Sequence, residues 1–230
     1  MLALQHDLHR LRMSDHITDT VLLLEHEPVV TLGRGAKDEH VLQPAEELAA
    51  AGIDLVATGR GGEVTLHAPG QLVVYPILNL APDRCDVRRY VKDLTLTMQG
   101  VAATLGVQSG MVDEHIGLWV DAESPGQWQG AEHAGRLAKL GAVGVRLSRW
   151  VSQHGFAFNL SVDLELYRLI VPCGIQTWGV TSILDLTGRC PSPAEVAPLA
   201  FELLCQRLDA SADGLHRELP SSNLEQYVSG

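Results

Sequence analysis

The sequence has no long apolar run, few aromatic residues and few positive charges. Nowhere do roughly 18 apolar residues follow one another, the length that a membrane-spanning helix needs. The N-terminus, Met1 to Asp7, lacks the charged segment and apolar stretch of an export signal. We therefore expect a cytoplasmic protein with no membrane partner.

Cysteines are also few, and their spacing is irregular. The four of them, Cys85, Cys173, Cys190 and Cys205, form no CxxC pair, and the ten histidines form no HxxxH pair. A disulfide framework needs an oxidising compartment and a structural zinc site needs closely spaced ligands. We expect neither, and the sequence predicts no metal and no cofactor.

Basic residues are outnumbered, with 17 Lys and Arg against 28 Asp and Glu, which gives a formal net charge of −11. This balance argues against a nucleic-acid partner, because such binding relies on cationic contacts to phosphate. Hydrophobic residues make up 46% of the 230 residues, and no linker divides the chain. We expect one catalytic domain over 1–210 and a loosely ordered C-terminal tail over 211–230.

Hydrophobic periodicity and turn residues predict the helices and strands. Helices are expected over 1–13, 45–51, 86–105 and 192–208, the last opened by a capping box, Ser192 to Glu195. Strands are expected over 20–25, 29–32, 53–58, 72–78 and 117–120, and 136–149 with 151–162 should form a hairpin. The apolar run 20–25 is typical of a central strand. This irregular alternation favours an α+β fold with a mixed sheet.

A cysteine between a proline and a glycine, in Ile170-Val171-Pro172-Cys173-Gly174-Ile175, occupies a turn. A free cysteine is often only a small buried hydrophobic residue. A nucleophilic role requires the thiolate, and therefore a nearby group that stabilises the anion.

Lys139 is the candidate for that group. In an alternating strand it would share a face with Leu137, Gly141, Val143 and Val145, while Leu140 and Ala142 would occupy the opposite face. Neither face is plainly hydrophilic, and a desolvated lysine can act as a base or stabilise a nearby anion. The alternative is an edge-strand lysine that reaches out to solvent.

The glycine-rich stretch GRGGEVTLHAPGQ, residues 59–71, has neither the GxxxxGK[ST] nor the GxGxxG pattern of a phosphate loop. Its paired glycines, Gly61 and Gly62, would let a substrate approach the backbone, which predicts a pocket wall; two ordinary turns are the alternative. His67 and His154 are each either proton carriers or hydrogen-bonded structural histidines.

Five motifs occur together in order: EHEPVVTLGR from Glu25, RGGEVTLHAPGQ from Arg60, KLGAVGVR from Lys139, HGFAFN from His154, and PCGI followed by Val180-Thr181-Ser182. In this combination the chain resembles the octanoyltransferases of lipoate biosynthesis, the lipoyl(octanoyl) transferases of the lipoate-protein ligase B family. The resemblance runs from about Val21 to Ser182.

The resemblance implies a fold similar to the catalytic domain of biotin and lipoate protein ligases. It implies an acyltransferase that moves an octanoyl group from octanoyl-acyl carrier protein to a lysine of a lipoyl domain, in 2-oxoacid dehydrogenase complexes or the glycine cleavage H protein. In that family the cysteine becomes an acyl thioester and the lysine promotes thiolate formation, roles that fall on Cys173 and Lys139. His154 is a possible supporting residue. The implied substrate-binding residues are Arg60, Gly61, Gly62, Glu63, Val64, Thr65, Leu66, His67, Ala142, Val143, Gly144, Gly155, Phe156 and Ala157.

Small residues at Gly141, Ala142, Gly144 and Ala157 would leave room for an apolar acyl chain. Because both protein partners are commonly acidic, docking would use a basic patch, with Arg88, Arg89, Lys92, Arg146 and Arg149 as candidates. Two other readings stay open. One is an ATP-dependent lipoate or biotin ligase on the same scaffold, and the other is an acyl-binding or lipoyl-domain-docking protein without catalytic activity.

Overall fold

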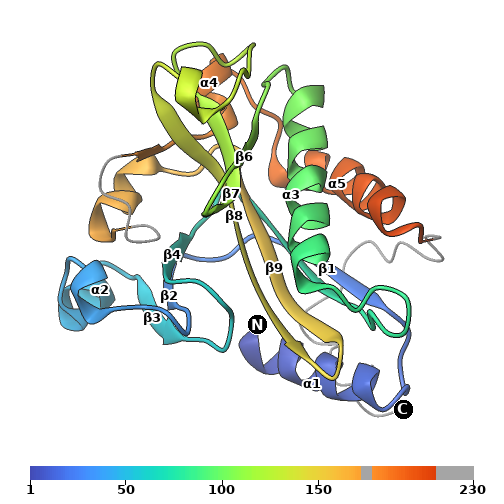
Figure 1. Cartoon of the computed structure of the whole chain (residues 1–230). Helices are drawn as coiled ribbons and strands as arrows, with labels where there is room; N and C mark the ends of the chain where they lie inside the picture. Colours follow the sequence, from blue (N-terminus) through green and yellow to red (C-terminus); the bar gives the residue numbers. More distant parts are fainter. Residues whose placement is uncertain (172–177, 211–230) are drawn as a thin grey trace.

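The computed structural model describes residues 1–171 and 178–210, and they form two sheets flanked by helices (Figure 1). The large sheet has the strand order β1-β5-β9-β8-β7-β6, with β10 paired to β8, and the small sheet has the order β3-β2-β4. The strands are β1 (Thr20–Leu24), β2 (Val29–Leu32), β3 (Asp54–Ala57), β4 (Val64–His67), β5 (Gln71–Ile77), β6 (Gly110–Val112), β7 (His115–Asp121), β8 (Leu137–Ser148), β9 (Val151–Asn159) and β10 (Gly179–Val180).

Helices cover both faces of the large sheet. One face packs against α3 and α5 around Leu94, Met98 and Phe158, and the other packs against α1 through Leu8. The α-helices are α1 (Leu2–Met13), α2 (Ala45–Ala50), α3 (Val87–Thr104), α4 (Ile183–Thr187) and α5 (Pro193–Leu208), and the 3₁₀ turns are η1 (Asp38–His40), η2 (Ala131–His133) and η3 (Leu164–Leu169). Both sheets combine parallel and antiparallel pairs, which confirms the predicted α+β fold with a mixed sheet.

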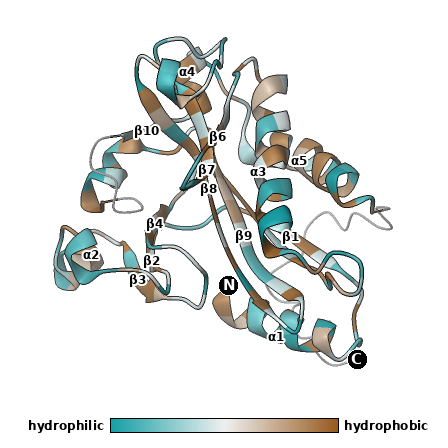
Figure 2. Cartoon of the chain, in the orientation of Figure 1, coloured by the Kyte–Doolittle hydropathy of each residue, from teal (hydrophilic) through white to brown (hydrophobic). Residues whose placement is uncertain are grey.

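The two long helices on the sheet begin where capping residues predict. The side chain of Asp86 accepts hydrogen bonds from the backbone of Arg88 and Arg89 at the start of α3. Ser192 and Glu195 form the predicted capping box at the start of α5. In Figure 2, α3 carries both hydrophilic and hydrophobic segments, as expected of a helix with one buried face.

Strand β1 was expected in the centre of a sheet, and this expectation is wrong, because β1 is an edge strand that pairs only with β5 among the described residues. Its apolar sequence has another cause. Val21 and Leu23 pack towards the core under α3 and α5, while Leu22 packs towards α1 on the opposite face. Strand β6 was not predicted, because three residues are too short a run to show alternation.

Strands β8 and β9 form the predicted hairpin, and β8 contains a β-bulge that the sequence analysis did not foresee. Trp119 is paired with Lys139, but Leu118 is paired with Gly141, so Leu140 is an extra residue in β8. Ala138 and Leu140 point to the core under α3, and after the bulge Val143 and Val145 do so as well.

The bulge corrects the predicted faces of this strand. Lys139 does not share a face with Gly141, Val143 and Val145, because the extra residue reverses the alternation between them. A Cβ placed on Gly141 would meet the sulfur of Met98 on α3. Lys139 therefore lies on the face that Ala142 and Gly144 occupy beyond the bulge.

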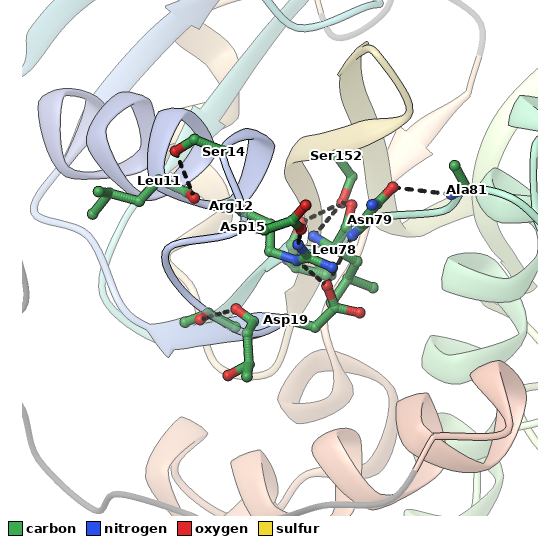
Figure 3. A network of polar contacts seen from close by, with 12 residues as sticks. Leu11, Arg12, Ser14, Asp15, Asp19, Leu78, Asn79, Ala81 and Ser152 are labelled. Carbon is green, nitrogen blue, oxygen red and sulfur yellow. Dashed lines mark hydrogen bonds and ion pairs between the residues drawn. The ribbon is translucent and has the colours of Figure 1, made fainter.

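A polar network fixes the C-terminal end of α1 to the large sheet (Figure 3). Asp19 Oδ1 accepts hydrogen bonds from Arg12 Nε at 2.6 Å and from the backbone N–H of Asn79 at 2.9 Å. Ser152 Oγ of β9 donates to Pro76 O and accepts from Leu78 N, at 2.7 and 3.0 Å. These bonds join the end of α1, the residue before β1, the end of β5 and the start of β9.

The helices of the described residues, 1–171 and 178–210, include none that is long and apolar enough to cross a membrane. The predicted tail over 211–230 lies outside the described residues, as does Cys173. The assignment of 1–210 to a single catalytic domain stays a prediction.

Candidate active site

A cavity of about 400 Å³ lies between the small sheet and the large sheet. Strands β2, β3 and β4 of the small sheet form one wall, β5, β8 and β9 of the large sheet form the other, and Leu2 and Gln5 of α1 contribute at one side. Most of the lining surface is apolar, although about half of the residues that contribute to it are polar or charged. An apolar surface with polar groups at fixed positions is typical of a site for a small organic group.

The cavity brings together most of the residues that the sequence analysis implicated in substrate binding. Those that line it are Arg60, Gly62, Glu63, Val64, Thr65, His67, Ala142, Val143, Gly144, Gly155, Phe156 and Ala157, together with His154. Gly61 does not line it, but its N–H donates to Val145 O at 2.8 Å and so joins the glycine loop to β8. Leu66 is fully buried in the core of the small sheet. Gly141, expected to widen the pocket, instead faces α3.

Several lining residues were missed by the sequence analysis. Tyr75 lies in a run that was interpreted only as a strand, and Gln5 lies in a helix that was interpreted only as amphipathic. His26 stands in the first of the five motifs, and that position was the one available signal. Its Nε2 lies 2.8 Å from the hydroxyl of Tyr75, and its ring centroid lies 5.4 Å from that of His67.

Arg60 holds the glycine loop against β2. Its NH2 donates to the backbone oxygen of Thr31 at 2.7 Å and to the hydroxyl of Thr31 at 2.9 Å. The backbone N–H of Gly33 donates to Glu63 O, and that of Gly35 donates to Gly62 O. A Cβ on Gly33 would lie only 2.3 Å from Gly62 O, so this close approach requires glycine.

The histidines of the cavity are held in the neutral form. Burial lowers the pKa of His67 to about 3 and that of His154 to about 4, because an imidazolium is poorly solvated there. Burial also lowers the pKa of His26 and raises that of Tyr75. His154 has a φ of 60°, and its N–H donates to Gln5 Oε1 at 3.0 Å. The wall that these four rings form is therefore polar but uncharged at neutral pH.

Lys139 is buried, with 6% of its surface exposed, on the face of β8 that Ala142 and Gly144 occupy beyond the bulge, and it is not among the residues that line the cavity. Its Nζ donates to Ile116 O at 3.2 Å and lies 4.7 Å from the centroid of the Trp119 ring. The ring of Trp178 packs edge-on against Trp119, at 5.3 Å between centroids. A cation over an aromatic face, inside a largely apolar setting, can stabilise an anion close to it.

Cys173 lies outside the described residues, but hydrogen bonds hold the chain on both sides of its segment, and the side that follows it runs beside Lys139. The N–H of Val171 donates to His40 O at 2.8 Å. On the other side, Val180 of β10 is the register partner of Lys139, and Thr181 N donates to Lys139 O at 3.0 Å.

Comparison with solved structures defines the class of fold. A structure from the archaeal lipoylation system of Thermoplasma acidophilum, described as a bipartite lipoate protein ligase and its E2 lipoyl domain, aligns with a TM-score of 0.66 at 12% identity, over 99% of this chain and 86% of that one. A lipoate-protein ligase A bound with ATP aligns with a TM-score of 0.65 at 12% identity, over 99% and 88%. The fold is that of the lipoate protein ligases, as the sequence predicts.

Sequence comparison then gives the family. Residues 1–204 match the family described as Lipoyl protein ligase A/B catalytic domain, and the chain belongs to it. Curated relatives named octanoyltransferase include those of Myxococcus xanthus, 44% identical over 209 residues, and of Chloroflexus aggregans, 44% identical over 207 residues. These alignments cover 91% and 90% of this chain, but 56% of the Myxococcus protein and 88% of the Chloroflexus one. The resemblance to the octanoyltransferases is confirmed, and these relatives are acyltransferases by name.

Proposed function

We propose that this protein transfers an octanoyl group from octanoyl-acyl carrier protein to a lysine of a lipoyl domain, through a thioester on Cys173. The acceptors would be the lipoyl domains of 2-oxoacid dehydrogenase complexes and the glycine cleavage H protein. The names of the relatives support octanoyl transfer, and the archaeal ligase is described together with its E2 lipoyl domain, which supports that class of acceptor.

The observation that carries the proposal is the cavity itself. Three segments far apart in the sequence, on β4, β8 and β9, meet around it with small residues, among them Ala142, Gly144 and Ala157. Larger side chains at these positions would fill the space, whereas the apolar surface that the small residues leave open suits a neutral acyl chain of eight carbons.

The first half-reaction exchanges one thioester for another. The Cys173 thiolate attacks the carbonyl carbon of the carrier thioester, a new C–S bond forms and the bond to the carrier sulfur breaks. The carrier thiolate leaves and takes up the proton that Lys139 had received from Cys173. The ammonium of Lys139 favours the attacking thiolate, and the register pairing of Val180 with Lys139 supports this assignment, because it holds the strand that follows the cysteine segment beside the lysine.

The second half-reaction makes an amide. The neutral amine of the acceptor lysine attacks the acyl-enzyme, the C–N bond forms and the C–S bond breaks. Lys139, or a water that it holds, assists deprotonation of the amine, and the departing thiolate recovers a proton. Neither step consumes a nucleotide.

Intact-mass measurement tests the proposal. After mixing with octanoyl-acyl carrier protein, the wild type should gain one octanoyl group, and Cys173→Ala should gain none. Cys85→Ala is the matched control, because Cys85 is exposed and remote in sequence from every motif, and it should be acylated as the wild type is. An unmodified wild type, or an undiminished adduct in Cys173→Ala, would refute the mechanism.

The same samples separate the rival readings. A ligase would form an acyl-adenylate from free octanoate and ATP, and would modify a lipoyl domain without the carrier protein. A binding protein would retain its partners in Cys173→Ala with no loss of function. We expect neither result.

A further inference from the structure

His67 lies at the end of β4 on the cavity wall, and one of its ring nitrogens forms a hydrogen bond within the protein. Its Nδ1 lies 2.8 Å from Oε1 of Gln71, the first residue of β5. His67 is 7% exposed and Gln71 is 1% exposed, so water does not compete for this bond. Which nitrogen of the ring carries the proton depends on which way round the Gln71 amide lies.

The surroundings fix that orientation. Gln71 Nε2 donates to Leu66 O at 3.3 Å and to Asn159 Oδ1 at 2.9 Å. Asn159 is itself oriented, because its Nδ2 donates to the backbone oxygen of Thr181 at 3.0 Å and a carbonyl oxygen can only accept. Gln71 Oε1 must therefore face His67 as an acceptor, and His67 Nδ1 must carry the hydrogen.

In a neutral imidazole the second nitrogen then has a lone pair. No residue within 1–171 and 178–210 pairs with His67 Nε2, and the ring lines the cavity. This nitrogen can accept a hydrogen bond from a bound molecule but cannot donate one. It is thus unsuited to stabilise an oxyanion, and suited to an N–H group.

The charges around the cavity indicate which N–H group of a bound molecule would donate to His67 Nε2. Four carboxylate residues, Glu25, Glu27, Asp54 and Glu63, contribute to the lining. Glu25 lies close to the β4–β5 turn, where its Oε2 accepts the N–H of Gly70 at 2.7 Å, three residues beyond His67. An acidic surround attracts a lysine and repels the phosphate of a carrier arm.

We propose that Gln71 holds His67 as its Nδ1–H tautomer, so that Nε2 accepts a hydrogen bond from the attacking amine of the acceptor lysine. The proposal rests on the proposed function. His67 orients the nitrogen lone pair of the amine towards the acyl carbon and takes no proton from it. Gln71 is a positioning residue that acts through His67.

The tautomer is tested without any substrate, by the side-chain ¹⁵N NMR signals of His67. At pH 7 the wild type should show a protonated Nδ1 and an unprotonated Nε2. Gln71→Leu should lose this pattern, because it leaves Nδ1 without its acceptor. A protonated Nε2 in the wild type would overturn the proposal, whatever the enzyme's activity.

The role in transfer is tested by measuring the two half-reactions separately. In His67→Asn the amide nitrogen can replace Nδ1 as donor to Gln71, but the Nε2 acceptor is lost. Acylation of Cys173 should stay within about twofold of the wild type, and transfer to a lipoyl domain should fall about tenfold, which is the worth of one hydrogen bond. His133→Asn, on an exposed 3₁₀ turn, is the matched control and should change neither step.

A loss confined to the acylation step would overturn the assignment, because Nε2 would then hold an amide of the carrier arm. Unchanged rates in both steps would also overturn it. A wild type that forms no acyl-enzyme would instead refute the proposed function. The tautomer of His67 would still be established by NMR, because that measurement needs no substrate.

Discussion

At the scale of single residues, the cavity contains histidines that stay uncharged where most surface histidines would titrate. His67 and His154 have their pKa values lowered by burial, to about 3 and about 4. A wall of neutral rings can contact an alkyl chain with little desolvation cost, and it still offers hydrogen-bonding atoms at fixed positions. The consequence is that the folded state becomes less stable in mild acid.

His154 makes that cost measurable. Its pKa is about 4 in the folded state and near 6.5 in the unfolded state, so the unfolded state binds the proton more readily as the pH falls below 6.5. Between pH 7.5 and 5, His154 should lower the free energy of unfolding by about 2 kcal/mol, and the loss continues down to about pH 4.

Urea unfolding of wild type and His154→Asn checks this prediction. Asparagine tolerates the φ of 60° at this position but does not titrate. The variant should therefore lose about 2 kcal/mol less than the wild type between pH 7.5 and 5. Equal losses in the two proteins would show that His154 is not held neutral by the fold.

At the scale of elements, the β8–β9 hairpin turns through two residues that carry positive φ angles without being glycine. Arg149 has a φ of 49° and Trp150 a φ of 64°. Two-residue turns with both φ angles positive favour Asn-Gly, since bulky residues are strained there. The double substitution Arg149→Asn and Trp150→Gly should raise the free energy of unfolding by about 1 kcal/mol.

The control for this turn is Arg149→Ala with Trp150 unchanged, which leaves both left-handed residues in place without a glycine or an asparagine. It should bring no gain in urea unfolding. A double variant less stable than the wild type would mean that the packing of Trp150 outweighs the strain.

The sequence predicted the helices and strands that are marked by capping residues or by hydrophobic periodicity. Features that depend on contacts between distant segments could not be predicted. Helix α3 could be predicted from the periodicity of its apolar residues and helix α5 from its capping box at Ser192, because both signals lie in the sequence itself. The edge position of β1 could not be predicted. Helices cover both faces of the sheet at this strand, so its residues are as apolar as those of a central strand. The bulge at Leu140 could not be predicted either, because an alternation rule assumes one residue per step.

At the scale of the whole molecule, the candidate site is an assembly of distant segments. The motifs named the wall residues of β4, β8 and β9, but they gave no distances between them. Gln5, His26 and Tyr75 contribute to the lining only because α1, the β1–β2 connection and β5 meet at one cavity. Such non-local proximity is a property of the fold and leaves no pattern in a single sequence.

Docking of an acidic partner depends on which face of the whole molecule carries the exposed basic residues. Arg146 is exposed on the cavity side, where its guanidinium lies over Gly59. Arg88 and Arg89 are exposed on α3, which packs on the opposite face of the large sheet (Figure 1). Arg146→Glu should lower kcat/KM for the carrier protein several-fold at low salt, about three- to tenfold, and added salt should reduce the difference.

The paired reversal Arg88→Glu with Arg89→Glu is the control, and we expect it to change this kcat/KM by less than about twofold. If the α3 variant is the more impaired of the two, the carrier approaches from the helical side and the assignment of Arg146 is wrong.

The bulge in β8 sets which side chains face the cavity beyond it. Leu140 and Gly141 follow one another on the side of α3, so Ala142 and Gly144 lie on the same face of the strand as Lys139. A chain without Leu140 would alternate regularly, because Gly141 would follow Lys139 on the opposite face, and Ala142 and Gly144 would stay beside the cavity. Loss of this one residue should therefore shorten the strand by one step and leave the set of lining side chains unchanged.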